Sequence, residues 1–441
     1  MPPVLWLEGV GYPVSTVVGV ASFLTSPLLL AYRWKRTPWV RPMLDGWQRR
    51  ITGRPDWQWL RLRHLLLALV LVTAANVGFQ VATLHCSDDS LAILASGQAA
   101  LSGHNPFLVN YCGGTSPANI PYGTAEVALN ALGALSGSVA GMWLVWQLLA
   151  LAVIPLVWRL AGADRRYVTA LVATSVLYLP NIATNIGVEN AVVPVAILLV
   201  LYAMTQRGPR RVAFQALGAF LCTARFPALF GALGSSGPLR RRAAVAQLGV
   251  VLSTFGAAVL LSYALWGWSA VSIVYLGQFS RASNESLNLL AVFLVEGWLH
   301  STLLTAAIQG VGVLALVVFV HWRGYEGAAA SALPMIGVMA LSQYLTFHFV
   351  LWLVPLLLLG GRVNRWLYVY GVLAWFDENV PLGYFGLSQG VWWPYEVCGV
   401  ALTAVLVYVA IVIVRAEEAR RHGTPPTEPD PSRAPPLPAV G

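Results

Sequence analysis

The stretch from Leu84 to Tyr122, LHCSDDSLAILASGQAALSGHNPFLVNYCGGTSPANIPY, contains neither lysine nor arginine. It joins two apolar segments, and the paired carboxylates Asp88 and Asp89 follow directly after the first of them. Lysine and arginine collect on the cytoplasmic side of membrane proteins, so a loop that lacks both is typical of the opposite side. We therefore predict an extracytoplasmic loop that holds a carboxylate at the membrane surface.

The composition of the whole chain also indicates a membrane protein. Of its 441 residues, 57% are hydrophobic and 10% are charged, whereas a soluble domain has about 25% charged residues. The mean hydropathy is +0.67. The net charge of +9 does not indicate a nucleic-acid partner, because the arginines form short clusters between apolar runs. The opening residues, MPPVLWLEG, lack the basic region of a signal peptide, so we expect the first span to be retained.

We predict an all-α, polytopic protein of the cell membrane, with about 11 to 13 transmembrane or half-spanning helices. Residues 1–62 should form an extra span and a basic cytoplasmic loop, residues 63–415 the transmembrane catalytic domain, and residues 416–441 a disordered, Pro-rich cytoplasmic tail. A short amphipathic or re-entrant piece is expected at Pro121–Leu135. The expected spans are Pro13–Tyr32, His64–Leu84, Gly141–Leu160, Tyr167–Pro180, Ala191–Met204, Ala243–Leu265, Leu303–Val320, Ala328–Leu345, Phe349–Leu359, Trp366–Phe376 and Tyr395–Val414.

The segment Val212–Leu239 lies between two arginine clusters that should share the cytoplasmic side. It is too short for two full spans of about 20 residues each. We predict a hairpin of two half-helices with its apex at Thr223–Pro227, because Pro227 lacks an amide hydrogen and disfavours helix at Phe226. Irregular backbone inside a membrane persists only where protein or a water-filled cavity covers it, so Arg225 is expected in a cavity.

The acidic pair of the outer loop could carry chemistry. A carboxylate at the end of a span can be partly desolvated and can act as a general base on a hydroxyl group. The alternative is a solvated pair whose aspartate caps a helix that begins near Ser90. Cys86 and Cys112 lie in the same loop, where a disulfide would close it around Asp88 and Asp89, or both could remain thiols. No cluster has metal-ligand spacing, and no cofactor is expected.

Several short motifs follow one another in the order seen in a known family. The run from Asp89 through Gly103 to Phe107 resembles the first outer loop of the GT-C glycosyltransferases. The ordered set is similar to the polyprenol-phosphate-mannose-dependent mannosyltransferases, glycosyltransferase family 87, over about residues 65–360. The other matching segments are Pro121–Gly123, Gly187–Asn190, Ala224–Pro227, Asn284–Leu287 and Ser342–Pro355. The chain departs from the family at Ile93, Thr346 and Phe349, where the family has an aromatic residue, Trp and His, and it lacks the Arg that often follows the Asn-Gln-Ser-Leu motif.

The resemblance implies a function for these residues. A sugar, mannose in that family, would pass from a polyprenyl-phosphate donor in the membrane lipid to a glycolipid or glycan acceptor on the extracytoplasmic face. Asp89 would be the base, with Asp88 as its support. A cation assists the departing phosphate, and the planar fork of arginine can donate two hydrogen bonds to it. Arg281 and Arg225 are the arginines that the predicted topology leaves to the outer side, and His348 is a third candidate.

The remaining polar candidates are expected to contact the sugar or the acceptor: Glu189, Asn190, Asn105 and Asn284. Each candidate also has a structural interpretation. Arg281 could be an exposed loop charge, Arg225 a partner of Glu189 or of half-helix carbonyls, His348 a structural residue, and Asn105 part of the turn before Pro106. Glu126 and Glu296 are weaker candidates that could simply face water. Broken helices and intramembrane charges also suit a multi-pass transporter or lipid flippase, and a non-catalytic scaffold is a third alternative.

Overall fold

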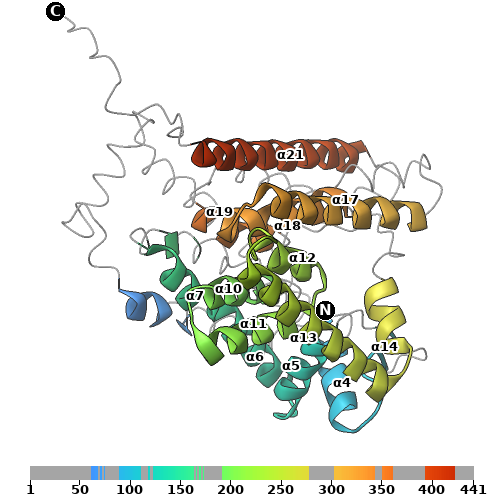
Figure 1. The fold of residues 1–441 in the computed structure, drawn as a ribbon. Helices are drawn as coiled ribbons and strands as arrows, with labels where there is room; N and C mark the ends of the chain where they lie inside the picture. Colours follow the sequence, from blue (N-terminus) through green and yellow to red (C-terminus); the bar gives the residue numbers. More distant parts are fainter. Residues whose placement is uncertain are drawn as a thin grey trace, which may run out of the picture.

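The computed structural model describes residues 61–67, 70–71, 74, 89–110, 118–119, 123–162, 165, 168–169, 172, 191–277, 302–342, 350–360 and 393–422 (Figure 1). This part of the chain is almost entirely helical, which confirms the all-α prediction. Its principal helices are α4 (Asp89–Leu101), α5 (Thr124–Ala134), α6 (Val139–Leu151), α7 (Val153–Leu160), α10 (Val192–Ala203), α11 (Gly208–Cys222), α12 (Pro227–Gly234), α13 (Arg242–Trp266), α17 (Thr302–Arg323), α18 (Gly327–Leu341), α19 (Val350–Leu359) and α21 (Trp393–Arg421).

Within the described residues, four helical segments are long and apolar enough to cross a membrane: Val139–Leu160, Arg242–Trp266, Leu303–Arg323 and Gly399–Arg421. They correspond to four of the predicted spans, with ends that differ by a few residues. The chain is therefore a membrane protein. In Figure 1, α21, α17 and α18 lie along one edge of the molecule, and α4, α5 and α6 lie along the opposite edge.

Shorter helices fill the space between the spanning ones. Every residue of α10 from Val192 to Leu201 is buried, because α7, α11, α12 and α19 all pack around it. A helix that is apolar on all sides is typical of such an interior position. The core of the protein therefore lies around α10, as Figure 1 shows.

The predicted break in the second half of the chain is present. Helix α11 ends at Cys222 and α12 begins at Pro227. One detail of the prediction was wrong: Phe226, at φ −54° and ψ −26°, keeps right-handed helical backbone angles. The helix is interrupted within residues 223–226, and Pro227 contributes there by lacking the amide hydrogen that a continuous helix would use.

Hydrogen bonds show that α11 and α12 form a hairpin. Thr223, just after α11, accepts a hydrogen bond from the first turn of α5, which also contacts Ser262 near the end of α13. At the end of α12, Ser235 accepts a hydrogen bond from Gln247, in the second turn of α13. The chain therefore turns back after residue 226. We call the end of α13 at Trp266 the apex end of the molecule, and the end at Arg242 the basic end.

A layer made of α4, α5 and α6 stands beside this hairpin. A side chain on Gly97 of α4 would lie 2.3 Å from the carbonyl oxygen of Asn130, so the two helices approach closely there. Phe107, shortly after α4, is buried with Val127 in the first half of α5. These contacts make α4 and α5 antiparallel. Between them, β1 (Leu108–Val109) and β2 (Ala118–Asn119) pair as a short antiparallel ladder that the sequence did not predict.

Candidate active site at the break between α11 and α12

Three of the predicted site residues fall within the part of the chain that the structure describes: Asp89, Asn105 and Arg225. Asp89 is the first residue of α4, so the expected helix after the acidic pair is confirmed. The other predicted residues lie outside the described residues: Asp88, Arg281, His348, Glu189, Asn190, Asn284, Cys86 and Cys112. Cys222 is buried at the end of α11.

Arg225 lies in the break and pairs with Glu126, from the first turn of α5. The Nε atom of Arg225 is 3.4 Å from Oε2 of Glu126, and the two side chains are 13% and 0% exposed. Glu126 was a weaker candidate whose alternative was to face water, and its full burial contradicts that alternative. The alternative of a structural pair for Arg225 named Glu189, but the carboxylate that the structure places beside it is Glu126. Removing two charges from water is costly, and their mutual attraction offsets this cost only in good geometry.

Residues of the break are hydrogen-bonded to the start of α5. The amide of Gly123 donates a hydrogen bond to the carbonyl of Ala224 over 3.1 Å, and the amide of Ala125 donates to Oγ1 of Thr223 over 3.0 Å. Thr223 thus serves as a cap for α5 from another element, because the first amides of a helix have no partner within it. A side chain at Gly123 would lie 1.6 Å from the carbonyl oxygen of Thr223. Only glycine permits this approach.

Helix α13 and the segment after it complete the walls of the site. Thr124 Oγ1 lies 2.7 Å from Oγ of Ser262 and donates to the carbonyl of Ala258 over 3.1 Å. Tyr275, in the π-helical turn η3 (Ser272–Leu276), makes edge-to-face ring contacts with Phe226 and Phe255, at centroid distances of 6.3 and 5.9 Å. Burial raises the pKa of Tyr275 to about 12, so its phenol stays neutral. Thr124 and Phe226, which flank the segments that carry the ion pair, thus contact the hydroxyl of Ser262 and the ring of Tyr275.

Asn105 lies in a turn beside the same end of α13. Its amide oxygen accepts a hydrogen bond from the amide of Phe107 over 3.0 Å, and its amide nitrogen donates to Oγ of Ser269 over 2.7 Å. The ring of Phe107 packs edge-on against Trp266, with centroids 5.7 Å apart. These contacts match the alternative that assigned Asn105 to the turn before Pro106. The hydrogen bond from Asn105 to Ser269 connects the segment after α4 with the short helix α14 (Ser269–Val271).

The antiparallel arrangement of α4 and α5 separates Asp89 from the break. Glu126 belongs to the first turn of α5, which neighbours the end of α4. Asp89 is at the start of α4, and Ala100, which packs beside Phe107 and Val127, follows it by eleven residue steps, a rise of about 16 Å. Among the described residues, Glu126 is thus the carboxylate that contacts Arg225, and Asp89 lies farther along α4.

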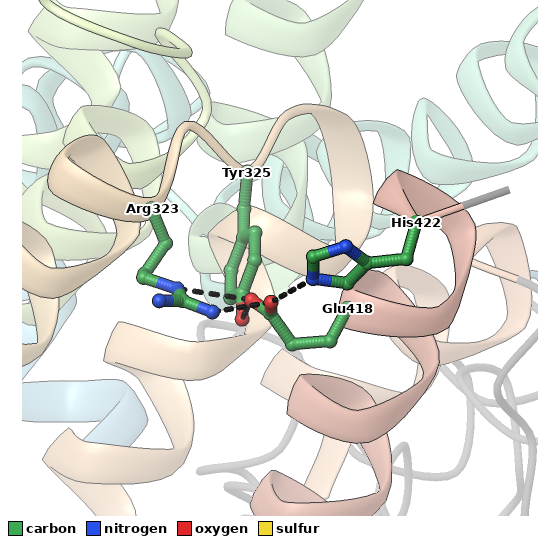
Figure 2. A network of polar contacts seen from close by, with 4 residues as sticks. All are labelled: Arg323, Tyr325, Glu418 and His422. Atoms are coloured by element: carbon green, nitrogen blue, oxygen red, sulfur yellow. Dashed lines mark hydrogen bonds and ion pairs between the residues drawn. The ribbon is translucent and has the colours of Figure 1, made fainter.

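A second charged cluster lies at the basic end. Arg323, Tyr325 and His422 converge on the carboxylate of Glu418, as Figure 2 shows. The Nε atom of Arg323 donates to Oε1 of Glu418 over 3.0 Å, and His422 Nε2 lies 3.7 Å from Oε2. Burial, followed by the hydrogen bond to Glu418, raises the pKa of Tyr325 to about 12. Side-chain exposure of 36% for Arg323 and 21% for Glu418 marks this cluster as partly solvated.

Sequence reasoning underestimated Glu126, and it missed Thr124, Thr223 and Tyr275 as parts of one site. A signal for Glu126 was present, since it is the single charged residue of α5 (TAEVALNALGA). An ionisable residue in an apolar helix is by default a functional hypothesis. The hydroxyl groups carried no comparable signal, because Thr and Tyr are common in apolar segments. No group of three His, Cys, Asp or Glu able to hold a metal ion occurs among the described residues.

Comparison of the chain with protein-family models, with curated proteins and with solved structures returned no match. The class of this protein is therefore argued from its own helices and residues. It is a helical membrane protein with a charged pair at the break of a helical hairpin.

Proposed function

We propose that this protein is an integral-membrane glycosyltransferase of the GT-C type. It transfers a sugar, with mannose as the first candidate, from a polyprenyl-phosphate donor to a glycolipid or glycan acceptor of the cell envelope. The observation that carries the proposal is Arg225: its side chain is 13% exposed, lies in a helix break, and is held by a fully buried carboxylate. Ionisable groups within membrane segments are costly and mark substrate sites.

The depth of Arg225 suits a lipid-borne phosphate. The first turn of α5, which joins the break, contacts Ala258 and Ser262 of α13, eight and four residues before its end at Trp266. This is a rise of about 12 and 6 Å from the end of the spanning helix. A polyprenyl phosphate keeps its tail in the bilayer and its phosphate near the surface. The guanidinium is therefore within reach of the level at which the donor phosphate would lie.

The proposed reaction assigns each group a step. The acceptor hydroxyl oxygen attacks the anomeric carbon, and the bond from that carbon to the phosphate oxygen breaks. The electron pair leaves with the polyprenyl phosphate, to which Arg225 donates hydrogen bonds as negative charge develops. The hydroxyl proton passes to a carboxylate base, for which the family motif favours Asp89. Asp88, Arg281, His348, Glu189, Asn190 and Asn284 keep their expected roles within this proposal, on the extracytoplasmic face.

Two carboxylates compete for the role of base. A base and a leaving phosphate act on opposite faces of one sugar carbon, so they should lie within about 10 Å of each other. Asp89 meets this condition only if the donor site extends along α4, whereas Glu126 meets it directly. We retain Asp89 as the base and assign Glu126 to the positioning of Arg225. Asp89→Asn should therefore abolish transfer while donor binding persists, and full activity in this variant would transfer the role to Glu126.

The central test is sugar transfer by purified protein in lipid nanodiscs. Radiolabelled polyprenyl-phosphate-mannose and a membrane extract as acceptor should yield labelled glycolipid or glycan. Loss of one charge-stabilising donor costs about 100- to 1,000-fold in rate, so Arg225→Gln should lose activity on that scale. Arg159→Gln, at the exposed end of α7, is a matched control that should keep it. Absence of transfer from any polyprenyl-phosphate sugar would overturn the proposal.

A transporter or lipid flippase is the second candidate, because broken helices with charges also form transport sites. Transport sites of that kind lie near the middle of the membrane. The break instead adjoins residues in the last third of α13, which favours a site near the surface. Movement of labelled lipid across proteoliposomes without sugar transfer would select the transporter.

A further inference from the structure

Three separate segments of the chain meet at the basic end of the molecule. They are the connection before α13, the turn between α17 and α18, and the last turn of α21. His321 Nδ1 lies 2.7 Å from the carbonyl oxygen of Gly237, and Arg241 forms an ion pair with Glu326. A side chain at Gly324 would contact both Pro238 and Arg421 within 4 Å. Residues far apart in sequence thus form one continuous surface.

This surface carries more positive than negative charge. Its described residues include three glutamates, each in an ion pair with one arginine: Glu326 with Arg241, Glu418 with Arg323 and Glu417 with Arg420. Three further arginines belong to the same segments: Arg240, Arg242 and Arg421. Six arginines against three glutamates leave an excess of three positive charges, before any contribution from His422. We call the six arginines together with Trp322 the basic platform.

The position of two of these arginines has an electrostatic cost within the protein. Arg241 precedes α13 and Arg242 is its first residue, and the N-terminus of a helix carries partial positive charge. Cations are disfavoured there by a few tenths of a kcal/mol or more. Arg241 has Glu326 as its partner, but no ion pair within the described part of the chain involves Arg240 or Arg242. An external anion would offset this repulsion.

The exposed Trp322 indicates the depth of the basic platform in the membrane. Trp322 is 77% exposed at the end of the spanning helix α17, and the guanidinium of Arg323 lies 5.8 Å from the centre of its ring. Indole rings at the ends of spanning helices favour the head-group layer of the bilayer, because one edge is apolar and the other polar. The neighbouring arginines therefore lie at the level of lipid phosphates.

We propose that the basic platform binds the head groups of anionic phospholipids in the adjoining leaflet. The excess positive charge and the depth set by Trp322 both match a phosphate that is anchored in the bilayer. Basic clusters beside spanning helices bind anionic lipids with about 1 kcal/mol for each arginine, a tenfold change in affinity for every 1.4 kcal/mol. This lipid site is independent of the proposed sugar transfer, because it lies at the opposite end of α13 from Arg225.

The test compares lipid retention by two doubly substituted variants. Full-length protein is reconstituted in nanodiscs with equal phosphatidylglycerol and phosphatidylcholine, and the retained lipid is identified by native mass spectrometry. Arg240→Ala with Arg242→Ala removes two exposed arginines and leaves all three ion pairs. We expect on the order of thirtyfold weaker retention of phosphatidylglycerol. Arg159→Ala, in the last turn of α7, with Arg165→Ala, five residues after that helix, removes the same charge elsewhere and should retain the lipid.

Further arms separate the possible outcomes. Arg240→Lys with Arg242→Lys keeps the charge and should keep phosphatidylglycerol, which excludes misfolding as the cause of loss in the alanine variant. Soluble glycerol phosphate should fail to displace the lipid, since it lacks the bilayer anchor. Equal retention of both phospholipids by the unsubstituted protein, equal loss in the two alanine variants, or displacement by glycerol phosphate would each overturn the proposal.

Discussion

The two charged clusters of this protein use the same chemical groups in opposite surroundings. At the apex end, Arg225 and Glu126 are 13% and 0% exposed, and the segments that carry them contact the ring of Tyr275 and the hydroxyl of Ser262. At the basic end, Arg323 and Glu418 are 36% and 21% exposed, and they belong to a larger set of arginines and glutamates. Solvent screens the second pair and not the first. The comparison shows that the same two chemical groups occur in this protein both buried and partly exposed.

A buried pair is poor evidence for stability as such. Replacement of both partners by neutral groups is often tolerated, whereas removal of one partner leaves a buried charge without compensation. We therefore expect the charge of the apex pair to serve a ligand. We expect the basic-end network to hold helices together near the membrane surface. The predictions below test this contrast, beginning with the largest effect.

The largest effect should come from removing one partner of the apex pair. Glu126→Gln or Arg225→Gln should each destabilise the protein by about 3–5 kcal/mol, because the remaining charge stays buried. The measurement is thermal denaturation in detergent, followed by the fluorescence of native tryptophans.

The doubly substituted variant provides the control for this prediction. Glu126→Gln together with Arg225→Gln should recover most of the lost stability, because no uncompensated charge remains. It should still fail to transfer sugar, because the cation for the donor phosphate is gone. A double variant that recovers both stability and activity would show that the pair is only structural.

The next effect concerns the contact between Gly123 and the break. Gly123→Ala would place a methyl group 1.6 Å from the carbonyl oxygen of Thr223, so the backbone must shift. Overpacking of this kind costs about 1–3 kcal/mol. Gly249→Ala in α13 is the matched control, because open space surrounds that position and alanine is the better helix former. Equal denaturation temperatures for the two variants would contradict the close approach.

A smaller effect is expected from the network in Figure 2. Arg323→Ala or Glu418→Ala should lower the denaturation temperature by much less than Glu126→Gln, because partly exposed pairs contribute little. The loss should shrink further in high salt, which screens exposed charges but not buried ones. A salt-independent loss as large as that of Glu126→Gln would remove the distinction between the two clusters.

A further effect, confined to strong alkali, is a loss of stability as the pH rises. The pKa of Tyr275 is raised to about 12 in the folded protein, against an ordinary value of 10. The unfolded state therefore releases its proton first, and the stabilisation is complete below pH 10 and lost as the pH rises to about 12. Tyr275→Phe should flatten the decline of denaturation temperature in this window. An unchanged decline would show that other groups cause it.

Much of the fold could be predicted from local patterns. The spans around α13 and α17 follow from long apolar runs that end at Arg242 and Arg323. The hairpin was predicted because the segment between two arginine clusters is too short for two full spans, and Pro227 indicated where the helix would break. These predictions succeeded because membrane thickness and proline geometry act on the chain one segment at a time.

The composition of the site could be predicted only in part. Arg225 was expected in a cavity; the structure shows that its side chain is 13% exposed and paired with Glu126. Its partner Glu126 was only a weaker candidate that could simply face water, because nothing in the sequence ties residue 126 to residue 225. Asn105 was a candidate for sugar binding, but its amide is engaged by Phe107 and Ser269. Pairing between distant segments depends on how helices pack, and single-sequence patterns do not encode packing directly.

The sequence by itself determined that this chain enters a membrane, where its long apolar helices run, and that one of its hairpins is broken beside an arginine. Hydropathy, charge and proline act over a few residues, so a linear reading is enough for them. Only the tertiary structure decided that Glu126 faces Arg225, that Thr223 caps α5, and that arginines from three segments meet at one end. Such contacts join groups about 85 to 100 residues apart, and they form because close packing of helices brings distant segments together and buried polar groups must find partners there.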